Sequence, residues 1–434
     1  MTSAVETRPL PAVERGRLTA RHWLVILTVA LAPISYIPHE LSSSRWSPTY
    51  PYFALIVITA IATSAFRRRS KWVTTACVAL GVWITTLLAL NLAFGFSTQG
   101  PVFLVRELLV LAAGVVMFRI AQADEYKRAV AIGLRVALVL TCAFGIWQEY
   151  IGLRPLLELG YTDGFFYATA DGNYRPFGTF YSPTVYGAFV AMLGIAVIAT
   201  TQRLIWRLVW IALTTYVVLI TETRSAILGL LLAAAVIYIR RFGVVPAHHI
   251  IWYVQGVLLL LIVYLMGWVP TSVTTVWDRL MGATEAGDTS RGTRWELWSA
   301  VTAAINDQHL WLIGFQDAAF APIVTPYTGS SIASLGHAHS NYFQELFRYG
   351  YPGLLLFLVL LGTFVYTITR SRPFVPSGMS AAGLGGLIVF AVDSFFNNSL
   401  SSFNVFVTLF LIVGLGCSSQ AYQRKQGVTR YAQT

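Results

Sequence analysis

The chain has 434 residues, of which 56% are hydrophobic and only 11% are charged. Because soluble domains carry roughly 25% charged residues, this composition excludes an ordinary soluble protein. The formal net charge of +11 does not indicate a nucleic-acid partner, since the basic residues lie in short clusters between apolar runs and form no stripe with aromatics. The sequence therefore predicts an all-α polytopic membrane protein embedded in a lipid bilayer, with no nucleic acid as partner.

The apolar runs predict about twelve transmembrane helices, because each run has nearly the length that a bilayer requires. The predicted spans are 22–38, 51–66, 72–96, 104–122, 129–151, 184–202, 205–222, 225–240, 250–268, 351–369, 378–397 and 403–421. No small-x-small cleavage site follows the first run, so it is interpreted as a span and not as a signal peptide. We expect a tail over 1–21, a single transmembrane domain over 22–421 and a tail over 422–434.

The connections between spans predict the orientation of the chain. Basic clusters, such as the one at 67–71, all fall on one face if about twelve helices are drawn, and by the positive-inside rule this face is cytoplasmic. Both tails then lie in the cytoplasm. The opposite face carries two large extracytoplasmic loops, over 152–183 and 269–340. In the second loop, "RGTRWELWSAVTAAI" (291–305) has helical apolar spacing, which predicts a surface helix along the membrane.

Several arginines lie on the outer side against the charge rule, namely Arg175, Arg224, Arg279, Arg291 and Arg294. Arg224 separates two apolar runs in "LITETRSAILGLLLA" with almost no loop, and an arginine at membrane depth marks a functional site by default. One interpretation is that Arg224 pairs with Glu222 in a tight turn or snorkels to the interface. The other is that several guanidiniums converge on a polyanion, since arginine binds phosphate bidentately.

The stretch "SRGTRWELW" contains a second candidate arginine. Arg294 and Trp298 lie four residues apart, and Trp295 and Trp298 lie three apart. On a helix, this spacing could bury both tryptophans while Arg294 faces a cavity. An amphipathic interfacial helix with ordinary flanking arginines explains the same pattern.

The stretch "GHAHSNYFQELFRYGYPG" (336–353) places two histidines just before an apolar run. His337 and His339 cannot face one way on a strict helix, so only one of them is expected to point at a site. The pair could bind a metal ion, but no third histidine or carboxylate cluster lies near it in the sequence. A single histidine suits a general base that accepts a hydroxyl proton. A helix-cap or interface histidine remains the structural alternative.

Four stretches together resemble the O-antigen ligase/polymerase superfamily, multi-spanning enzymes that handle undecaprenyl-diphosphate-linked glycans on the outer face of the cytoplasmic membrane. In the family's order, they are "RPFGTFYSPTVYGAFVAM", "TETRSAILGLLLA", "RWELWSAVTAAINDQHLWLIGFQ" and "HSNYFQELFRYGYPGLLLFL". They cover residues 175–360, whereas the N-terminal third is similar only in hydropathy. The sequence departs from the family pattern at Ser340, where Asn is usual, and at Arg348, where Glu often stands.

The resemblance implies a glycosyltransferase with catalytic residues His339, Arg224 and Arg294. His339 would accept the proton of an attacking sugar hydroxyl, and the two arginines would stabilise the leaving lipid diphosphate. Substrate contacts are expected from Arg175, Arg291, His337, Asn341 and Tyr342. No cofactor and no metal are expected, since the sequence has no obvious Asp-x-Asp motif, and the transfer is expected to be inverting.

The implied partners are an undecaprenyl-diphosphate-linked glycan donor and a sugar or lipid-glycan acceptor. The resemblance implies the cytoplasmic (inner) membrane, with the active site on the extracytoplasmic side. Polymerase, ligase and protein-targeting oligosaccharyltransferase activities share this chemistry and remain open. Aromatics in the loop over 152–183 could stack on sugars or form a lipid-interface belt. A transporter or flippase of an anionic lipid-linked sugar is the alternative, although it has less use for His339 as a base.

Overall fold

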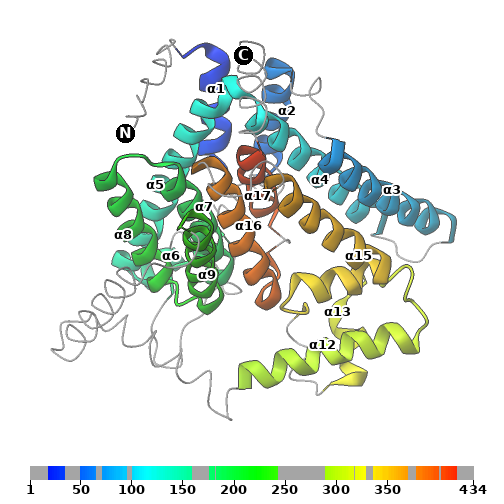
Figure 1. Cartoon of the computed structure of the whole chain (residues 1–434). Helices are drawn as coiled ribbons and strands as arrows, with labels where there is room; N and C mark the ends of the chain where they lie inside the picture. The colour runs from blue at the N-terminus through cyan, green and yellow to red at the C-terminus, as the bar shows by residue number, and fades with distance from the viewer. Residues whose placement is uncertain are drawn as a thin grey trace, which may run out of the picture.

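The computed structural model describes residues 18–34, 49–64, 71–94, 100–158, 175–180, 182–242, 289–316, 318–328, 336–369, 378–399 and 402–417. Within these residues the chain is helical and has no strand, which confirms the predicted all-α class. The helices form a bundle, and the helix at Thr289–Asp307 (α12) lies across its lower end (Figure 1). The predicted span at 250–268, Arg279 and the tail over 422–434 lie outside the described residues.

The bounds of the helices follow the apolar runs. In the first half they are α1 (Ala20–Ala30), α2 (Thr49–Thr63), α3 (Lys71–Phe94), α4 (Gly100–Gln122), η2 (Asp124–Tyr126), α5 (Lys127–Ile151) and α6 (Leu153–Glu158). In the second half they are α7 (Pro183–Thr200), α8 (Leu204–Ile220), α9 (Arg224–Phe242), α12, α13 (Phe320–Val324), η3 (Thr325–Tyr327), α15 (Asn341–Thr369), α16 (Gly378–Phe396) and α17 (Phe403–Cys417). Helix α1 is shorter than the predicted 22–38, because Pro33 cannot continue a helix.

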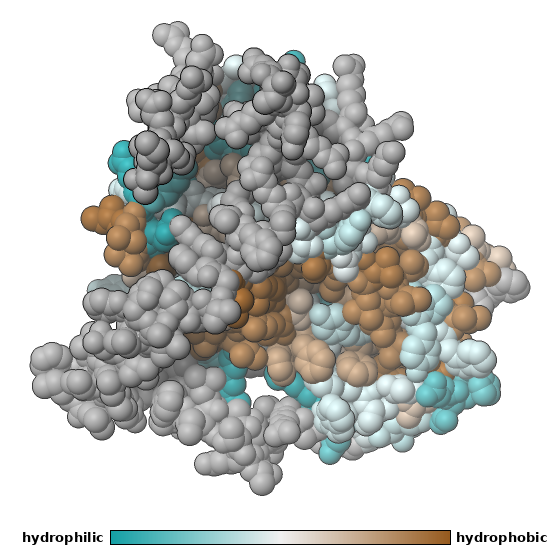
Figure 2. Space-filling model, in the orientation of Figure 1, coloured by the Kyte–Doolittle hydropathy of each residue, from teal (hydrophilic) through white to brown (hydrophobic). Residues whose placement is uncertain are grey.

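The helices are those of a multi-pass membrane protein. Among the described residues, five helices are long and apolar enough to span a bilayer, namely Trp72–Ala93, Asp124–Ile151, Pro183–Thr200, Asn341–Thr369 and Gly378–Phe396. Shorter apolar helices lie at Ala20–Ala30, Tyr50–Thr63, Leu204–Ile220, Arg224–Ile239 and Phe403–Cys417. Figure 2 shows hydrophobic side chains across the middle of the described surface and more hydrophilic ones at its lower edge, in the region of α12. The number of twelve spans and the full loop over 269–340 stay predictions.

The centre of the bundle is formed by α16, which packs against α7, α9 and α17. Glycines allow a close approach to α17: a Cβ atom built on Gly383 of α16 would lie 2.8 Å from the Cα atom of Gly416 in α17. Small residues let helix backbones approach in this way in membranes, where dispersion contacts stabilise association. This contact lies in the N-terminal half of α16, whereas the candidate site lies at the C-terminal end of the same helix.

Helix α15 is broken into two parts at Gly350. The residue has a φ of 69°, in the left-handed region, which a glycine adopts without steric cost. A Cβ atom at Gly350 would also clash with the Trp311 carbonyl oxygen. The predicted span at 351–369 coincides with the second part, whereas the helix before the break, from Asn341, extends beyond the prediction.

A turn after α12 docks on this break. The backbone N–H of Phe315 donates to the carbonyl of Phe347 at 2.7 Å, and that of Gln316 donates to Arg348 at 2.9 Å. These bonds satisfy carbonyl groups that the interrupted helix leaves without an internal partner. Gly314 in the turn has a φ of 62°, and a Cβ atom there would lie 2.6 Å from the Arg348 carbonyl carbon. The two glycine-containing stretches of the sequence thus fit against each other.

Candidate functional site

The segment before α15 carries both histidines and is fixed from two helices. The indole Nε1 of Trp298 in α12 donates to the carbonyl of Ala338 at 2.9 Å. The backbone N–H of Ala338 donates to Oε1 of Gln344 in α15 at 3.1 Å. The next residue, His339, has a φ of 48°, a backbone conformation that side-chain-bearing residues rarely adopt. Such outliers are retained where the surrounding structure determines them, and they cluster at functional sites.

The two imidazole rings lie against each other. Their centroids are 4.2 Å apart, and the backbone N–H of His339 donates to Nδ1 of His337 at 3.3 Å. The helical spacing assumed from the sequence does not apply here, because both residues precede the first turn of α15. The expectation that only one of the two points at a site stays a prediction.

Burial and positive neighbours keep both imidazoles neutral. Burial, followed by the charges of His337 and Arg294, lowers the pKa of His339 from its ordinary 6.5 to about 3. Burial, followed by the charge of Arg348, also lowers the pKa of His337. A neutral imidazole has a free nitrogen lone pair, so His339 is in the protonation state that a general base requires. The charge of Arg294 contributes to this effect on His339.

The first residues of α15 are tied to the end of α16. The hydroxyl of Ser340 donates to the Ser394 carbonyl at 3.2 Å. The side-chain amide of Asn341 donates to Ser394 Oγ at 2.7 Å and to Ser399 Oγ at 3.0 Å, and Asn341 is fully buried. These hydrogen bonds fix the start of α15 against the end of α16. Its predicted contact with a substrate stays a prediction.

Tyr342 is half-buried beside the same helix end. Its hydroxyl donates to the carbonyl of Ala391 at 3.1 Å, and its ring lies 6.1 Å from that of Phe395. The aromatic face of Tyr342 therefore borders the site from the bundle side. Its predicted substrate contact is likewise untested.

Helix α12 confirms the predicted helix at 291–305 and presents Arg294 toward α15 and α16. Trp298 stacks on Phe343 with 5.0 Å between ring centroids and meets Phe395 edge-on at 5.2 Å. The prediction that both tryptophans are buried is wrong: Trp298 is 6% exposed and Trp295 is 71% exposed. Only one face of α12 packs against other helices, and Trp295 lies beyond the edge of that face. Arg291 lies one turn earlier in α12, and its side chain is outside the described structure.

Arg224 is the first residue of α9, directly after a tight turn. Glu222 in this turn has a φ of 51°. Its carboxylate lies 3.7 Å from Nε of Arg175, which also donates to the Thr221 carbonyl at 2.8 Å. The hydroxyl of Thr223 donates to the Pro183 carbonyl at 3.2 Å. Arg175 thus supports the turn that positions Arg224, and Glu222 forms an ion pair with Arg175.

A buried carboxylate that was not among the residues predicted from the sequence links these parts. Asp393 near the end of α16 accepts hydrogen bonds from Ser225 Oγ at 2.7 Å and from the Asn397 amide at 2.5 Å. Asp393 also interacts electrostatically with Arg294. The available signal was its position: Asp393 is the one ionisable residue in the apolar span 378–396, and such residues are usually functional.

The site therefore joins all four motif stretches at one end of the bundle, the first of them through the bonds of Arg175 and Pro183 to the turn before Arg224. Arg294 interacts electrostatically with both His339 and Asp393, and Asp393 accepts a hydrogen bond from Ser225, the neighbour of Arg224. Among the described residues, no three His, Cys, Asp or Glu side chains cluster as metal ligands would. The fold and site define a multi-pass helical membrane protein with arginines, neutral histidines and a buried carboxylate gathered at one end.

Comparison with known proteins supports this family resemblance. Residues 209–358 match the family model described as O-Antigen ligase, which confirms that the chain resembles the O-antigen ligase/polymerase superfamily. The matched segment contains Arg224, Arg294 and His339. No curated protein matches the chain.

Proposed function

We propose that the chain is an integral-membrane glycosyltransferase that takes a glycan from an undecaprenyl-diphosphate-linked donor. The acceptor is a sugar hydroxyl on a glycan or lipid-glycan, and the transfer takes place at the outer face of the cytoplasmic membrane. The family match supports glycan transfer or ligation in a membrane. The observation that carries the proposal is the electrostatic interaction of Arg294 with both His339 and Asp393, beside the hydrogen bond from Ser225, the neighbour of Arg224, to Asp393.

The proposed reaction forms one glycosidic bond and breaks another bond at the same carbon. The acceptor oxygen attacks the anomeric carbon from the side opposite to the leaving group, which inverts that centre. The bond from the anomeric carbon to the diphosphate oxygen breaks, and its electron pair stays on the diphosphate. The acceptor proton passes to the neutral imidazole of His339. No oxidant or reductant is needed.

The arginines supply the electrostatic part of this mechanism. Negative charge grows on the diphosphate as the bond breaks, and guanidiniums placed in a low-dielectric site stabilise it. Arg224 and Arg294 are proposed for this role because arginine remains charged when buried and binds phosphate oxygens bidentately. The diphosphate of a bound donor would in turn raise the pKa of His339 and so strengthen it as a base. The proposed transfer needs no metal ion.

Asp393 is proposed as a positioning residue. Its carboxylate accepts a hydrogen bond from Ser225 and balances part of the charge of Arg294, so it connects two of the four motif stretches. Arg175 acts in a similar way on the turn before Arg224. Four further residues are proposed to contact the substrate or to support the residues that do, namely Arg291, His337, Asn341 and Tyr342.

Deletion of the gene in the source organism tests the proposal. The proposal predicts that a lipid-linked glycan accumulates, which mass spectrometry of extracted lipids identifies. Single repeat units would indicate a polymerase and finished chains a ligase. Accumulation on the cytoplasmic face only would instead favour a flippase, and an unchanged set of lipid-linked glycans would contradict the proposal.

A further inference from the structure

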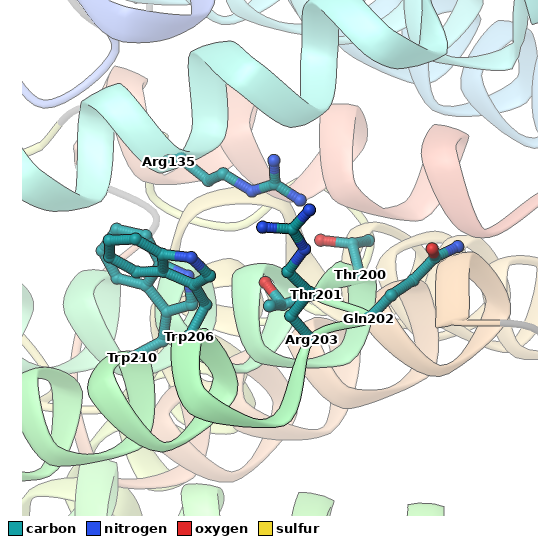
Figure 3. A pocket seen from close by; sticks show the side chains of 7 residues that line it. All are labelled: Arg135, Thr200, Thr201, Gln202, Arg203, Trp206 and Trp210. Atoms are coloured by element: carbon teal, nitrogen blue, oxygen red, sulfur yellow. The ribbon is translucent and has the colours of Figure 1, made fainter.

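A second charged cavity lies far from the candidate site. It has a volume of about 630 Å³ and is bordered by Arg135 of α5, by Thr201 and Arg203 in the connection from α7 to α8, and by Trp206 and Trp210 of α8 (Figure 3). None of these residues belongs to the four stretches that carry the family resemblance.

The cavity lies at the other end of the helices that lead to Arg224. Helix α7 has 18 residues and α8 has 17. At 1.5 Å per residue, each is roughly 25–27 Å long, close to the thickness of the hydrocarbon layer of a bilayer. The cavity and the candidate site therefore face opposite leaflets. Under the orientation predicted from the basic clusters, the cavity faces the cytoplasmic leaflet.

Two guanidiniums converge in this cavity. Figure 3 shows the ends of Arg135 and Arg203 directed toward each other. Arg135 lies two helical turns inside α5, and its Nε is buried without a hydrogen-bond partner in the described part of the chain. Like charges at close range repel, and buried guanidinium donors without acceptors are costly. This arrangement is favourable when an anion with several acceptor oxygens lies between them.

A third arginine adds to the positive charge. Arg207 donates from Nε and Nη2 to the Thr201 carbonyl at 3.2 and 2.8 Å, so it holds the connection that forms one wall of the cavity. The carboxylate of Asp124, just before α5, already forms an ion pair with Lys127 and not with an arginine of the cavity. Neither Arg135 nor Arg203 takes part in the ion pairs found within the described residues.

The walls of the cavity favour a lipid over a free ion. The indoles of Trp206 and Trp210 stack with 6.3 Å between centroids, and Trp206 is half-exposed. Leu204, Ile205 and Leu208 on the same helix are also exposed. Tryptophan is enriched at the level of lipid headgroups, and basic pockets between transmembrane helices bind anionic headgroups on the cytoplasmic side. The arginines would bind the phosphate of one lipid molecule, and the exposed apolar side chains of α8 would contact its acyl chain.

We propose that this cavity binds the phosphate group of an anionic membrane lipid, held between Arg135 and Arg203, with the lipid body against the Trp206–Trp210 face of α8. The site is separate from the proposed glycan-transfer site. It would anchor the α5–α8 side of the bundle in the leaflet opposite to that site.

The test uses the full-length protein purified in a mild detergent. The protein is incubated with phosphatidylglycerol or with phosphatidylcholine of identical acyl chains, and native mass spectrometry measures the lipid that remains bound. The wild type is expected to retain phosphatidylglycerol preferentially. The double variant R135Q/R203Q is expected to bind it about tenfold or more weakly, since charge-assisted bonds to phosphate are lost. Arg128→Gln removes one positive charge from an exposed position at the same end of α5 and is expected to bind as the wild type does.

Two further measurements distinguish the alternatives. The variant R135K/R203K preserves both charges and is expected to keep the preference for phosphatidylglycerol, even if the glutamine variant folds poorly. Inorganic phosphate at matched ionic strength is expected not to displace the lipid. Equal retention by the double glutamine variant and the wild type would overturn the proposal. Full displacement by inorganic phosphate would overturn the lipid assignment in favour of a free phosphate site.

Discussion

Ser225 donates a hydrogen bond of 2.7 Å to Asp393, and this contact joins the start of α9 to the end of α16. Arg224 is the neighbour of Ser225, so the position of Arg224 depends on a carboxylate that lies 168 residues after Ser225 along the chain. Asp393 also interacts with Arg294 of α12. One buried carboxylate therefore links both arginines that the sequence selects as catalytic.

Replacing either arginine should remove transition-state stabilisation. Arg224→Ala and Arg294→Ala are each expected to lower glycan transfer by about 10²–10³-fold, the usual loss when a donor to a developing negative charge is removed. Lysine at either position should restore part of the rate, since it keeps the charge but not the bidentate geometry. Quantifying product by mass spectrometry in a purified transfer assay checks this, with Arg128→Ala as the control. Wild-type rates in both alanine variants would refute the assignment.

Asp393→Asn should separate the role of charge from that of shape. Asparagine can still accept a hydrogen bond from Ser225, but it no longer balances Arg294. We expect transfer to fall by about 10–100-fold while the protein keeps its size-exclusion profile and helical signal. A positioning residue should affect kcat more than KM for the donor. An unchanged kcat would show that Asp393 serves packing alone.

The depressed pKa of His339 predicts a pH dependence of stability. Its folded-state pKa is about 3, below the ordinary 6.5, so between these values the unfolded chain binds a proton that the folded chain does not. The contribution of the neutral His339 to stability is thus present above pH 6.5 and is lost as pH falls toward 3. The Tm of the wild type should decrease relative to that of His339→Gln when pH is lowered from about 7.5 to about 5. The exposed His309→Gln is the matched control, and a constant difference for His339→Gln would contradict the prediction.

Gly350→Ala tests the break in α15. Alanine at a φ of 69° is strained and would clash with the Trp311 carbonyl, so a loss of at least about 1–2 kcal/mol of stability is expected. Gly362→Ala in the same helix has no atom within 4 Å of the new Cβ and should be neutral or stabilising. Thermal unfolding of the two variants in one detergent compares them. Equal stability of the two would show that the break does not depend on the left-handed glycine.

Much of the fold could be predicted because a bilayer imposes a length on every span. The predictions for 184–202, 225–240 and 378–397 differ from α7, α9 and α16 by a few residues at most. The polar helix before Gly350 was not predicted, because the spans were identified by continuous apolar character and "NYFQELFRY" lacks it. Its stability comes from packing against α12 and α16, which hydropathy does not report.

The site could be predicted less completely, because its geometry depends on contacts between distant segments. The spacing of His337 and His339 was interpreted on a helix, yet contacts from Trp298 and Gln344 hold the segment outside α15. The exposure of Trp295 depends on which face of α12 is covered. Asp393 had a usable signal in its apolar surroundings, but its partners lie on other helices.

The most direct test of the proposed function is transfer by the purified protein with a synthetic undecaprenyl-diphosphate-linked glycan and a sugar acceptor, in the presence of EDTA. Mass spectrometry measures the new glycosidic product and the released undecaprenyl diphosphate. The wild type should form both in equal amounts, and His339→Gln should form them at least about 10²-fold more slowly. Product formation at the wild-type rate by His339→Gln, or a wild-type reaction that stops with EDTA and resumes with added Mg²⁺, would contradict the proposed metal-independent mechanism with His339 as the base.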